Sequence, residues 1–384
     1  MIMVPAKTAR FLFAGGGTGG HLYPAIAIAQ RLSELLGNER QVEIHFVGTR
    51  RGIEYRMRES IGFPLELINV RGLARTLTLK NLLVPFLLIG AMIRTASLMK
   101  KYAPHVVIGT GGYVALPVLQ VAAMKKIPTV LQEQNSFPGI TTRKLAGRAQ
   151  RVYLGFEKAG EYLNTAAKVI VTGNPVRRSI SHGDREQAAR SFKLEACKRT
   201  ILVLGGSQGA RGINEAVLTS LKKADLPDGY QLLWQTGKGD YKEVTAIAGE
   251  KAGRSLFPFA TDMASVYAAA DVVVARAGAI SLAEIQACEL PSILIPYPYA
   301  AGDHQRKNAE ECVRKGYADM IDEKELAGID ILKRAVDLIE SGTAARMKTA
   351  LKRDNEARKP AVDLIAEDII NLLVEAERRE ASVA

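Results

Sequence analysis

Short apolar segments alternate with longer segments of helical periodicity along the whole chain. The first half contains RFLFAG, VEIHFVG, HVVIGTGG, PTVLQE and RVYLGF, and the second half contains TILVLGG, YQLLWQTG, SLFPFA, DVVVARAG and PSILIPYP. Strands that are apolar on both faces and are separated by helices are typical of parallel sheets with helices on both sides. The pattern therefore predicts an α/β fold with a parallel sheet in each half of the chain.

The segment VTGNPVR marks the boundary between the halves, because Gly173, Asn174 and Pro175 interrupt the pattern as a linker does. A chain of 384 residues also favours two domains, since single cores stop growing at about 250 to 300 residues. We expect one domain over residues 1–173 and a second over 174–359. Beyond them, apolar residues repeat at helical spacing and predict an amphipathic closing helix at about 360–380.

The net charge of +12 is unevenly distributed. Residues 1–173 contain 22 Lys and Arg against 9 Asp and Glu, whereas the remainder contains 30 against 31. A basic half indicates that one domain meets an anionic partner, either a nucleic acid or an acidic membrane surface.

The three cysteines are far apart and fit neither a disulfide framework nor a zinc site, which favours a reducing cytoplasm. The first strand begins near Arg10, so we expect no signal peptide.

The segment NLLVPFLLIGAMI, residues 81–93, contains no charge and has basic residues on both sides. It is too short to cross a membrane, because a spanning helix needs about 20 apolar residues. Two interpretations stay open: a buried core helix, or a helix that rests in the lipid headgroup region with its basic flanks on anionic lipids. The charge asymmetry favours membrane contact.

Two glycine turns follow apolar strands and open helices. Gly15, Gly17 and Gly20 have the spacing of a dinucleotide-binding motif, and GGSQGAR repeats the arrangement at residues 205–211. Both turns suit a phosphate, since backbone N–H groups and a helix N-terminus converge there, although a tight packing turn is an equal alternative. The doubling argues against a dehydrogenase, while Arg50 and Arg51 after the second strand leave an NADP enzyme open.

The stretch RAGAISLAE offers a carboxylate just after another strand. Glu284 lies where it could accept both hydroxyls of a ribose, although a first-turn glutamate favoured by the helix dipole is the simpler interpretation. The following DHQRKNA is rich in groups suited to sugar hydroxyls, with a solvated loop as the alternative.

Seven motifs occur in this order: GGGTGGHLYPA, GTGGYVALP, QEQNSFPG, TGNPVR, GGSQGARGIN, RAGAISLAE and DHQRKNA. Together they resemble the MurG family, the bacterial N-acetylglucosaminyltransferases that convert lipid I to lipid II in peptidoglycan synthesis. The resemblance runs from about Phe11 to about Asn308. It implies a GT-B fold, with two Rossmann-like domains facing across a cleft and the C-terminal helix packing back on the first. The dehydrogenase hypothesis is dropped on these grounds.

The resemblance implies that the second domain binds the donor, UDP-GlcNAc. Backbone groups of Phe259 and Ala260 would contact the uracil, and Glu284 would bind the ribose. Gln305 would contact the GlcNAc hydroxyls, with Asp303 or His304 beside it. The groups implied for the diphosphate are Arg177, Ser207, Gln208 and the helix start at Ala279 and Ile280.

The resemblance also implies that the first domain binds the acceptor, lipid I (undecaprenyl-pyrophosphoryl-MurNAc-pentapeptide). The implied acceptor-binding residues are Gly17, Thr18, Gly19, Gly20, His21, Gly112, Tyr113 and Asn135. His21 is the preferred general base, because an imidazole kept neutral at a helix N-terminus can accept a proton. The same side chain could instead donate a hydrogen bond to the acceptor pyrophosphate, and Glu133 is the alternative base.

The implied reaction is a single displacement with inversion, in which the C4 hydroxyl of MurNAc attacks the anomeric carbon and UDP leaves. No D-x-D motif occurs, so we expect no metal and no cofactor.

The resemblance implies a peripheral enzyme on the cytoplasmic face of the plasma membrane. Its partners would be an anionic membrane surface and cell-wall or division proteins, without nucleic acid. A UDP-sugar epimerase, another GT-B transferase and a non-catalytic nucleotide-binding membrane protein remain the alternatives.

Overall fold

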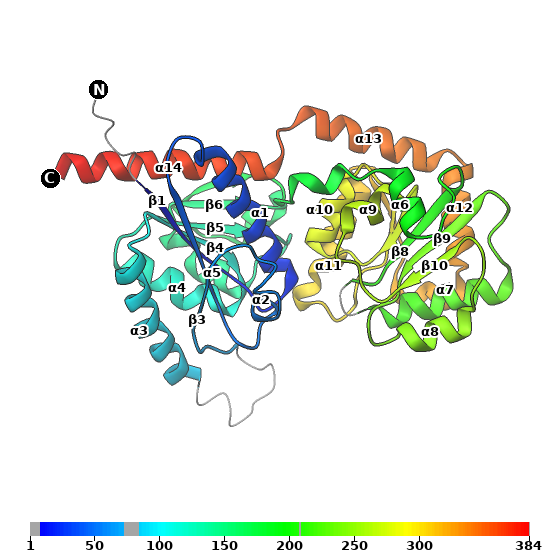
Figure 1. The fold of residues 1–384 in the computed structure, drawn as a ribbon, viewed down its shortest axis with the longest axis horizontal. Helices are drawn as coiled ribbons and strands as arrows, with labels where there is room; N and C mark the ends of the chain where they lie inside the picture. The colour runs from blue at the N-terminus through cyan, green and yellow to red at the C-terminus, as the bar shows by residue number, and fades with distance from the viewer. Residues whose placement is uncertain (1–7, 73–83, 207–208, 384) are drawn as a thin grey trace. The chain divides into compact units, whose positions relative to one another are not determined.

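The computed structural model describes residues 8–72, 84–206 and 209–383. The chain forms two compact units, the first comprising Met1–Arg177 with Pro360–Ala384 and the second Arg178–Lys359 (Figure 1). The change of unit at Arg177 lies four residues beyond the boundary expected at residue 173. Each unit has its own parallel sheet, so the α/β class predicted from the sequence is confirmed.

The first unit contains a seven-stranded sheet in the order β3-β2-β1-β4-β5-β6-β7. Its strands are β1 (Ala9–Gly15), β2 (Val42–Gly48), β3 (Leu65–Leu67), β4 (Val106–Gly111), β5 (Thr129–Glu133), β6 (Arg151–Leu154) and β7 (Lys168–Val171). The α-helices are α1 (Gly19–Leu36), α2 (Ile53–Arg56), α3 (Val84–Tyr102), α4 (Gly112–Met124), α5 (Ile140–Leu145) and α14 (Ala361–Val383). Short 3-10 segments are η2 (Ala146–Arg148) and η3 (Glu157–Tyr162).

Strand β1 shows why the apolar segments contain few polar residues. Phe11 and Phe13 belong to the core formed with α1 and α14, whereas Leu12 and Ala14 belong to the core formed with α3 and α4. All four side chains are buried. A strand with helices on both faces loses the alternation of apolar and polar residues that a half-exposed strand keeps.

Helix α14 belongs to the first unit although it ends the chain (Figure 1). Ile365, Ile369 and Leu373 are buried in the core that contains α1, at the helical spacing seen in the sequence. Several ion pairs also fix the helix, among them Arg31 to Asp363 at 2.6 Å and Arg151 to Asp368 at 3.1 Å. The closing helix is therefore an integral part of the first unit's core.

The second unit contains a six-stranded sheet in the order β10-β9-β8-β11-β12-β13. Its strands are β8 (Arg199–Leu204), β9 (Tyr230–Gln235), β10 (Arg254–Phe257), β11 (Val272–Ala275), β12 (Ser292–Leu294) and β13 (Ala318–Met320). The α-helices are α6 (Arg185–Ser191), α7 (Arg211–Lys223), α8 (Tyr241–Ala248), α9 (Met263–Ala268), α10 (Ala279–Ala287), α11 (His304–Arg314), α12 (Ile331–Glu340) and α13 (Thr343–Ala357). The 3-10 segments are η4 (Arg178–Ser181), η5 (Ala301–Asp303) and η6 (Glu323–Gly328).

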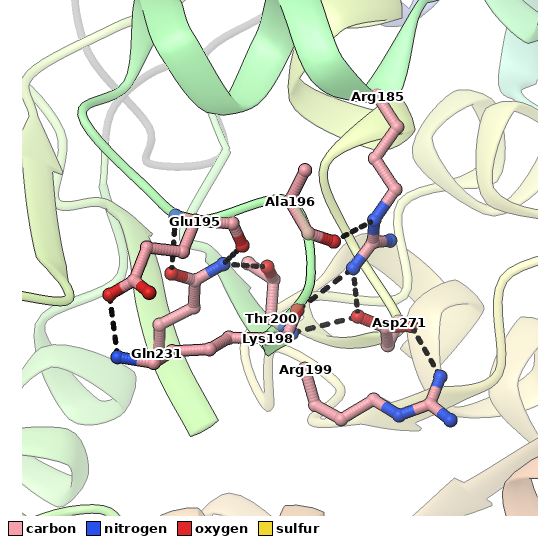
Figure 2. Close-up of polar contacts among 8 residues, drawn as sticks. All are labelled: Arg185, Glu195, Ala196, Lys198, Arg199, Thr200, Gln231 and Asp271. Atoms are coloured by element: carbon pink, nitrogen blue, oxygen red, sulfur yellow. Dashed lines mark hydrogen bonds and ion pairs between the residues drawn. The ribbon is translucent and has the colours of Figure 1, made fainter. Parts of the chain in front are cut away.

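A polar cluster ties α6 to the amino ends of β8 and β11 (Figure 2). Asp271 accepts hydrogen bonds from Arg185 at 2.7 Å, from Arg199 at 3.1 Å and from the backbone N–H of Thr200 at 2.8 Å. Beside it, the buried side chain of Gln231 bonds to both backbone groups of Glu195. This cluster lies at the edge of the sheet opposite to the glycine turn that follows β8.

Helix α3 has one packed face and one exposed apolar face. Ala91, Leu98 and Met99 are buried, while Phe86 is 73% and Ile93 is 68% exposed. The first three residues of the apolar segment 81–93 lie outside the described residues. In the part of the chain that the structure describes, no helix is long and apolar enough to cross a membrane.

Candidate active site

Most of the described candidate residues follow the carboxyl ends of central strands. In the first unit these are β1, β4 and β5, and in the second they are β8, β11 and β12, whereas Arg177 follows the edge strand β7 and Phe259 and Ala260 follow the edge strand β10. Strands β1 and β4, like β8 and β11, are the neighbours between which the strand order changes direction. Ligands of open parallel sheets bind at this point, because the loops after the two strands part there.

The glycine turn after β1 holds a buried carboxylate. Glu54, which is 1% exposed, accepts hydrogen bonds from the backbone N–H of Gly17 at 2.7 Å and of Thr49 at 2.8 Å. The Gly17 amide is therefore directed at Glu54 in this structure. Helix α1 begins at Gly19, and Thr18 supplies no side-chain cap to its N-terminus. The partial positive charge of that helix end lies beside Gly19 and Gly20.

The turn after β4 packs against the first glycine turn. Gly112 has a φ of +79°, and a Cβ atom there would lie 2.4 Å from the carbonyl oxygen of Gly16. Tyr113 covers Gly17, since a Cβ on Gly17 would lie 3.1 Å from its ring, and its hydroxyl lies 3.3 Å from that of Thr49. The two turns therefore form one surface, which brings Gly17, Gly112 and Tyr113 together.

His21 lies on the first turn of α1 and reaches β4 and β5. Its Nδ1 atom is 3.0 Å from the carbonyl oxygen of Thr110 and 2.9 Å from Oε1 of Gln134. The backbone carbonyl of His21 in turn accepts a hydrogen bond of 2.7 Å from the Thr110 hydroxyl. A carbonyl oxygen only accepts, so Nδ1 carries the proton and Nε2 carries the lone pair of the neutral ring.

Glu133 organises the loop after β5. Its buried carboxylate accepts hydrogen bonds from the Thr142 hydroxyl at 2.6 Å and from the backbone N–H groups of Gly139 at 3.0 Å and Asn135 at 3.1 Å. The side chain of Asn135 also faces this carboxylate, at 3.4 Å. All of these contacts direct the carboxylate at the loop that follows β5.

Arg177 lies at the end of the first unit. Its guanidinium group lies over the ring of Tyr23, 5.9 Å from the centroid, on the first turns of α1. The family resemblance implies a contact of Arg177 with the donor diphosphate, and Arg177 belongs to the unit that contains His21.

In the second unit a buried glutamine connects the glycine turn after β8 with the loop after β10. Gln235 donates to the carbonyl oxygen of Gly206 at 3.1 Å and accepts from the backbone N–H of Ala260 at 3.1 Å. The Ala260 N–H therefore points at Gln235. The Lys238 ammonium lies 5.7 Å from the centre of the Phe259 ring. Ser207 and Gln208, two expected diphosphate ligands, lie outside the described residues.

Glu284 lies on α10, and a buried tyrosine donates a hydrogen bond to its carboxylate. The hydroxyl of Tyr267 donates a hydrogen bond of 2.9 Å to Oε2 of Glu284. Burial, reinforced by the Glu284 charge, raises the pKa of Tyr267 well above its usual value, so the phenol stays protonated. Helix α10 begins at Ala279 and Ile280, with Gly278 as its N-cap. The carbonyl oxygen of the preceding, buried Ala277 accepts a 3.3 Å hydrogen bond from Asn308 of α11.

The loop between β12 and α11 is fixed by two side chains. Gln305 accepts a hydrogen bond of 3.0 Å from the backbone N–H of Tyr297. Arg276 donates to the carbonyl of Ile295 at 3.2 Å and pairs with Glu323 at 2.8 Å. These contacts place Gln305 at the carboxyl end of β12, on the same sheet edge as α10.

The sequence-based set lacks several residues that contribute to these arrangements, among them Glu54, Gln134, Gln235 and Tyr267. Gln134 is adjacent to two selected residues, Glu133 and Asn135, and lies in a recognised motif. The other three gave no local signal, because each acts through a partner distant in the sequence. Among the described residues, no three His, Cys, Asp or Glu side chains are grouped as ligands for a metal ion.

Comparison with known proteins identifies both units. Residues 11–154 match the glycosyltransferase family 28 N-terminal domain, and residues 200–366 match the glycosyltransferase family 28 C-terminal domain. A protein of Chlorobaculum parvum named UDP-N-acetylglucosamine–N-acetylmuramyl-(pentapeptide) pyrophosphoryl-undecaprenol N-acetylglucosamine transferase is 42% identical over 334 residues, which cover 86% of this chain and 90% of that protein. A protein of the same name from Thermoanaerobacter sp. (strain X514) is 39% identical over 95% of this chain and 99% of its own length.

Solved structures agree with this result. The crystal structure of Acinetobacter baumannii MurG has a TM-score of 0.70 and 25% sequence identity, and the match covers 95% of this chain and 99% of that one. A UDP-GlcNAc 2-epimerase of Neisseria meningitidis, bound to UDP-GlcNAc, has a TM-score of 0.65 at 14% identity, with 96% and 100% covered. The second likeness concerns the fold alone. The MurG structure, the two family 28 domains and the curated relatives agree. This chain therefore belongs to the MurG family of glycosyltransferases.

Proposed function

We propose that the chain transfers GlcNAc from UDP-GlcNAc to the C4 hydroxyl of MurNAc in lipid I and so forms the β-1,4 linkage of lipid II. Relatives about 40% identical over most of the chain carry the name of this transferase, and that observation supports the proposal most directly. The proposed reaction is a single displacement. The acceptor oxygen bonds to the anomeric carbon while the bond to UDP breaks, and the electron pair leaves with the diphosphate.

The first unit is proposed to bind the acceptor. The two glycine turns and the uncapped N-terminus of α1 suit the pyrophosphate of lipid I, because a helix N-terminus favours an anion. Thr18, Gly19, Gly20 and Gly112 would contact this group. Because the Gly17 amide already donates to Glu54, we assign Gly17 to the shape of the turn. Tyr113 and Asn135 would orient the sugar and its peptide.

His21 is proposed as the general base. Its protonated Nδ1 faces Thr110 and Gln134, so Nε2 is the nitrogen that would take the proton from the C4 hydroxyl. Glu133 is the weaker candidate, because its carboxylate is buried and already accepts several hydrogen bonds.

The second unit is proposed to bind UDP-GlcNAc. Phe259 and Ala260 would contact the uracil, and the Ala260 carbonyl is the better candidate there, since its N–H donates to Gln235. Glu284 would accept the ribose hydroxyls, and Gln305 would contact GlcNAc. The N-terminus of α10 at Ala279 and Ile280 would stabilise the leaving diphosphate together with Arg177, Ser207 and Gln208.

The exposed face of α3 is proposed to dock on an anionic membrane. Phe86, Ile89 and Ile93 are 73%, 57% and 68% exposed, and their spacing puts them on one side of the helix. Lys100 and Lys101 follow in its last turn. Apolar side chains with neighbouring lysines suit the boundary between headgroups and acyl chains. The proposed location is the cytoplasmic face of the plasma membrane, with cell-wall or division proteins as further partners.

Product analysis tests the proposed reaction. The purified protein is incubated with UDP-GlcNAc and a short-chain lipid I analogue, and the lipid product is isolated. We expect a GlcNAc–MurNAc disaccharide with a β-1,4 linkage. Conversion of UDP-GlcNAc to another UDP-sugar without lipid product would instead support an epimerase.

A further inference from the structure

A chain of buried amide side chains runs from His21 to the end of the first unit. Nδ1 of His21 donates to Oε1 of Gln134 at 2.9 Å, and Nε2 of Gln134 donates to Oε1 of Gln132. Nε2 of Gln132 then donates to Oδ1 of Asn174 at 3.0 Å. Gln134 and Gln132 are almost completely inaccessible, and Asn174 is buried as well.

The direction of every hydrogen bond in this chain is fixed by its last member. Nδ2 of Asn174 lies 2.9 Å from the backbone carbonyl oxygen of Gln134, which can only accept. Asn174 must therefore present Oδ1 to Gln132, and Gln132 must present its amide oxygen to Gln134. Gln134 in turn presents Oε1 to His21.

Two backbone carbonyls support the same orientation of Gln134. The carbonyl oxygens of Thr110 and Gln132 lie 2.7 Å and 3.0 Å from its Nε2, so they share the two amide hydrogens with Oε1 of Gln132. The opposite orientation would direct the amide oxygen at three acceptors, which would repel it. Asn174 itself fits closely after β6, where a Cβ on Gly155 would lie 2.4 Å from its Oδ1.

We propose that Asn174, Gln132 and Gln134 are positioning residues that hold His21 in the tautomer with the proton on Nδ1, and so keep Nε2 ready to accept a proton. The inference rests on the proposed function for its catalytic meaning, because it concerns the base of that reaction. It gives the asparagine of the linker motif a role in the first unit's chemistry. The amides are uncharged, so they orient the ring without adding a charge beside it.

Nitrogen-15 NMR of histidine-labelled protein tests the tautomer without any substrate. The His21 resonances are assigned by their absence in His21→Asn and are recorded at alkaline pH, where the imidazole is neutral. We expect a protonated Nδ1 and an unprotonated Nε2 in the unmodified protein. An Nε2–H tautomer there would overturn the proposal, whatever the glutamine and asparagine variants show.

Variants test the amide chain itself. In Gln134→Met the tautomer ratio should shift toward Nε2–H by about fivefold, the effect of losing one net hydrogen bond. Asn174→Ala should shift it in the same direction but by less, because Gln134 itself still accepts from Nδ1. The matched control is Gln231→Met, which removes a buried glutamine from the cluster in Figure 2 and should leave His21 unchanged. Unchanged His21 signals in both folded test variants would overturn the proposal.

Turnover separates this inference from the proposed function. If His21 has the expected tautomer but His21→Asn turns over normally, the base role fails and the amide chain stands. If His21→Asn is inactive but the tautomer is Nε2–H, the amide chain fails and the base role must use the other nitrogen.

Discussion

The hydroxyl of Tyr267 donates a 2.9 Å hydrogen bond to one carboxylate oxygen of Glu284. Tyr267 is buried and its raised pKa keeps it a donor, so the carboxylate is held from the core side. Glu284 itself is half-buried at the sheet edge where the second unit's other candidate residues gather. The hydrogen bond from Tyr267 therefore orients the Glu284 carboxylate before any ligand binds.

Replacement of Glu284 should weaken donor binding. In Glu284→Gln we expect the dissociation constant of UDP-GlcNAc to rise by at least about tenfold, because hydrogen bonds to a charged acceptor are lost. Tyr267→Phe should raise it by only a few-fold, since the carboxylate remains. Isothermal titration calorimetry measures both, with the exposed Glu243→Gln as the control. Equal affinity in Glu284→Gln and the control would exclude the ribose role.

Replacement of His21 should reduce turnover and spare donor affinity. Asparagine retains an N–H that can face the Thr110 carbonyl but lacks a nitrogen equivalent to Nε2. We expect kcat of His21→Asn to fall by at least about a hundredfold, the usual contribution of a general base. The control is His182→Asn, whose imidazole Nδ1 lies 2.7 Å from the carbonyl oxygen of Arg178. Near-normal turnover of His21→Asn would assign the proton transfer to another group.

The apolar face of α3 should control membrane binding. In the triple variant Phe86→Ser, Ile89→Ser, Ile93→Ser we expect sedimentation with anionic vesicles to be lost, because these exposed side chains supply the apolar contact. The fold should persist, since the packed face of the helix is intact. Met124→Ser removes a similarly exposed side chain elsewhere on the first unit and serves as the control. Full vesicle binding by the folded triple variant would refute the docking surface.

The sequence could predict the α/β class because both sheets rest on strands that are apolar on both faces, such as β1 and β8. It missed β3, β7 and β13, which have only three or four residues. These edge strands pair with one neighbour each, and β7 exposes Val169 and Val171 to solvent. Segments so short and so little buried carry no periodic pattern, and their pairing is decided by the completed sheet.

The sequence could predict only those residues of the candidate site that lie within a recognisable motif. The glycine turns and His21 follow strands that the sequence already indicated, so their grouping at one sheet edge is a consequence of the fold. Glu54 and Gln235 contact these turns from other parts of the chain, Glu54 lying 37 residues beyond Gly17. A contact of this kind requires the tertiary structure, because no local pattern records it.

Asp271 should contribute to the stability of the second unit. It accepts hydrogen bonds from Arg185, Arg199 and the Thr200 backbone in a largely buried setting (Figure 2). Asp271→Asn should lower the free energy of unfolding by about 2 kcal/mol, since charged hydrogen bonds are lost and an amide N–H faces two cations. Asp225 pairs with Lys251 and Arg254 but is half-exposed, so Asp225→Asn should cost less than about 1 kcal/mol. Urea unfolding measures both, and equal losses would contradict the account.

The three cysteines should differ in reactivity. Burial raises the pKa of the Cys288 and Cys312 thiols to about 12, so both stay protonated in mildly alkaline solution. The thiolate is the reactive form, and Cys197 is the exposed thiol. Alkylation of the native protein should therefore modify Cys197 rapidly and the other two only after denaturation. Mass spectrometry of the labelled peptides checks this, and rapid labelling of Cys288 would contradict its burial.

The most direct test of the central claim is the rate of UDP release from UDP-GlcNAc, measured with and without a short-chain lipid I analogue. We expect release that depends on the analogue and that equals the amount of disaccharide lipid formed. Release at the same rate without acceptor, or tight donor binding with no release, would contradict assignment of the chain to lipid II synthesis.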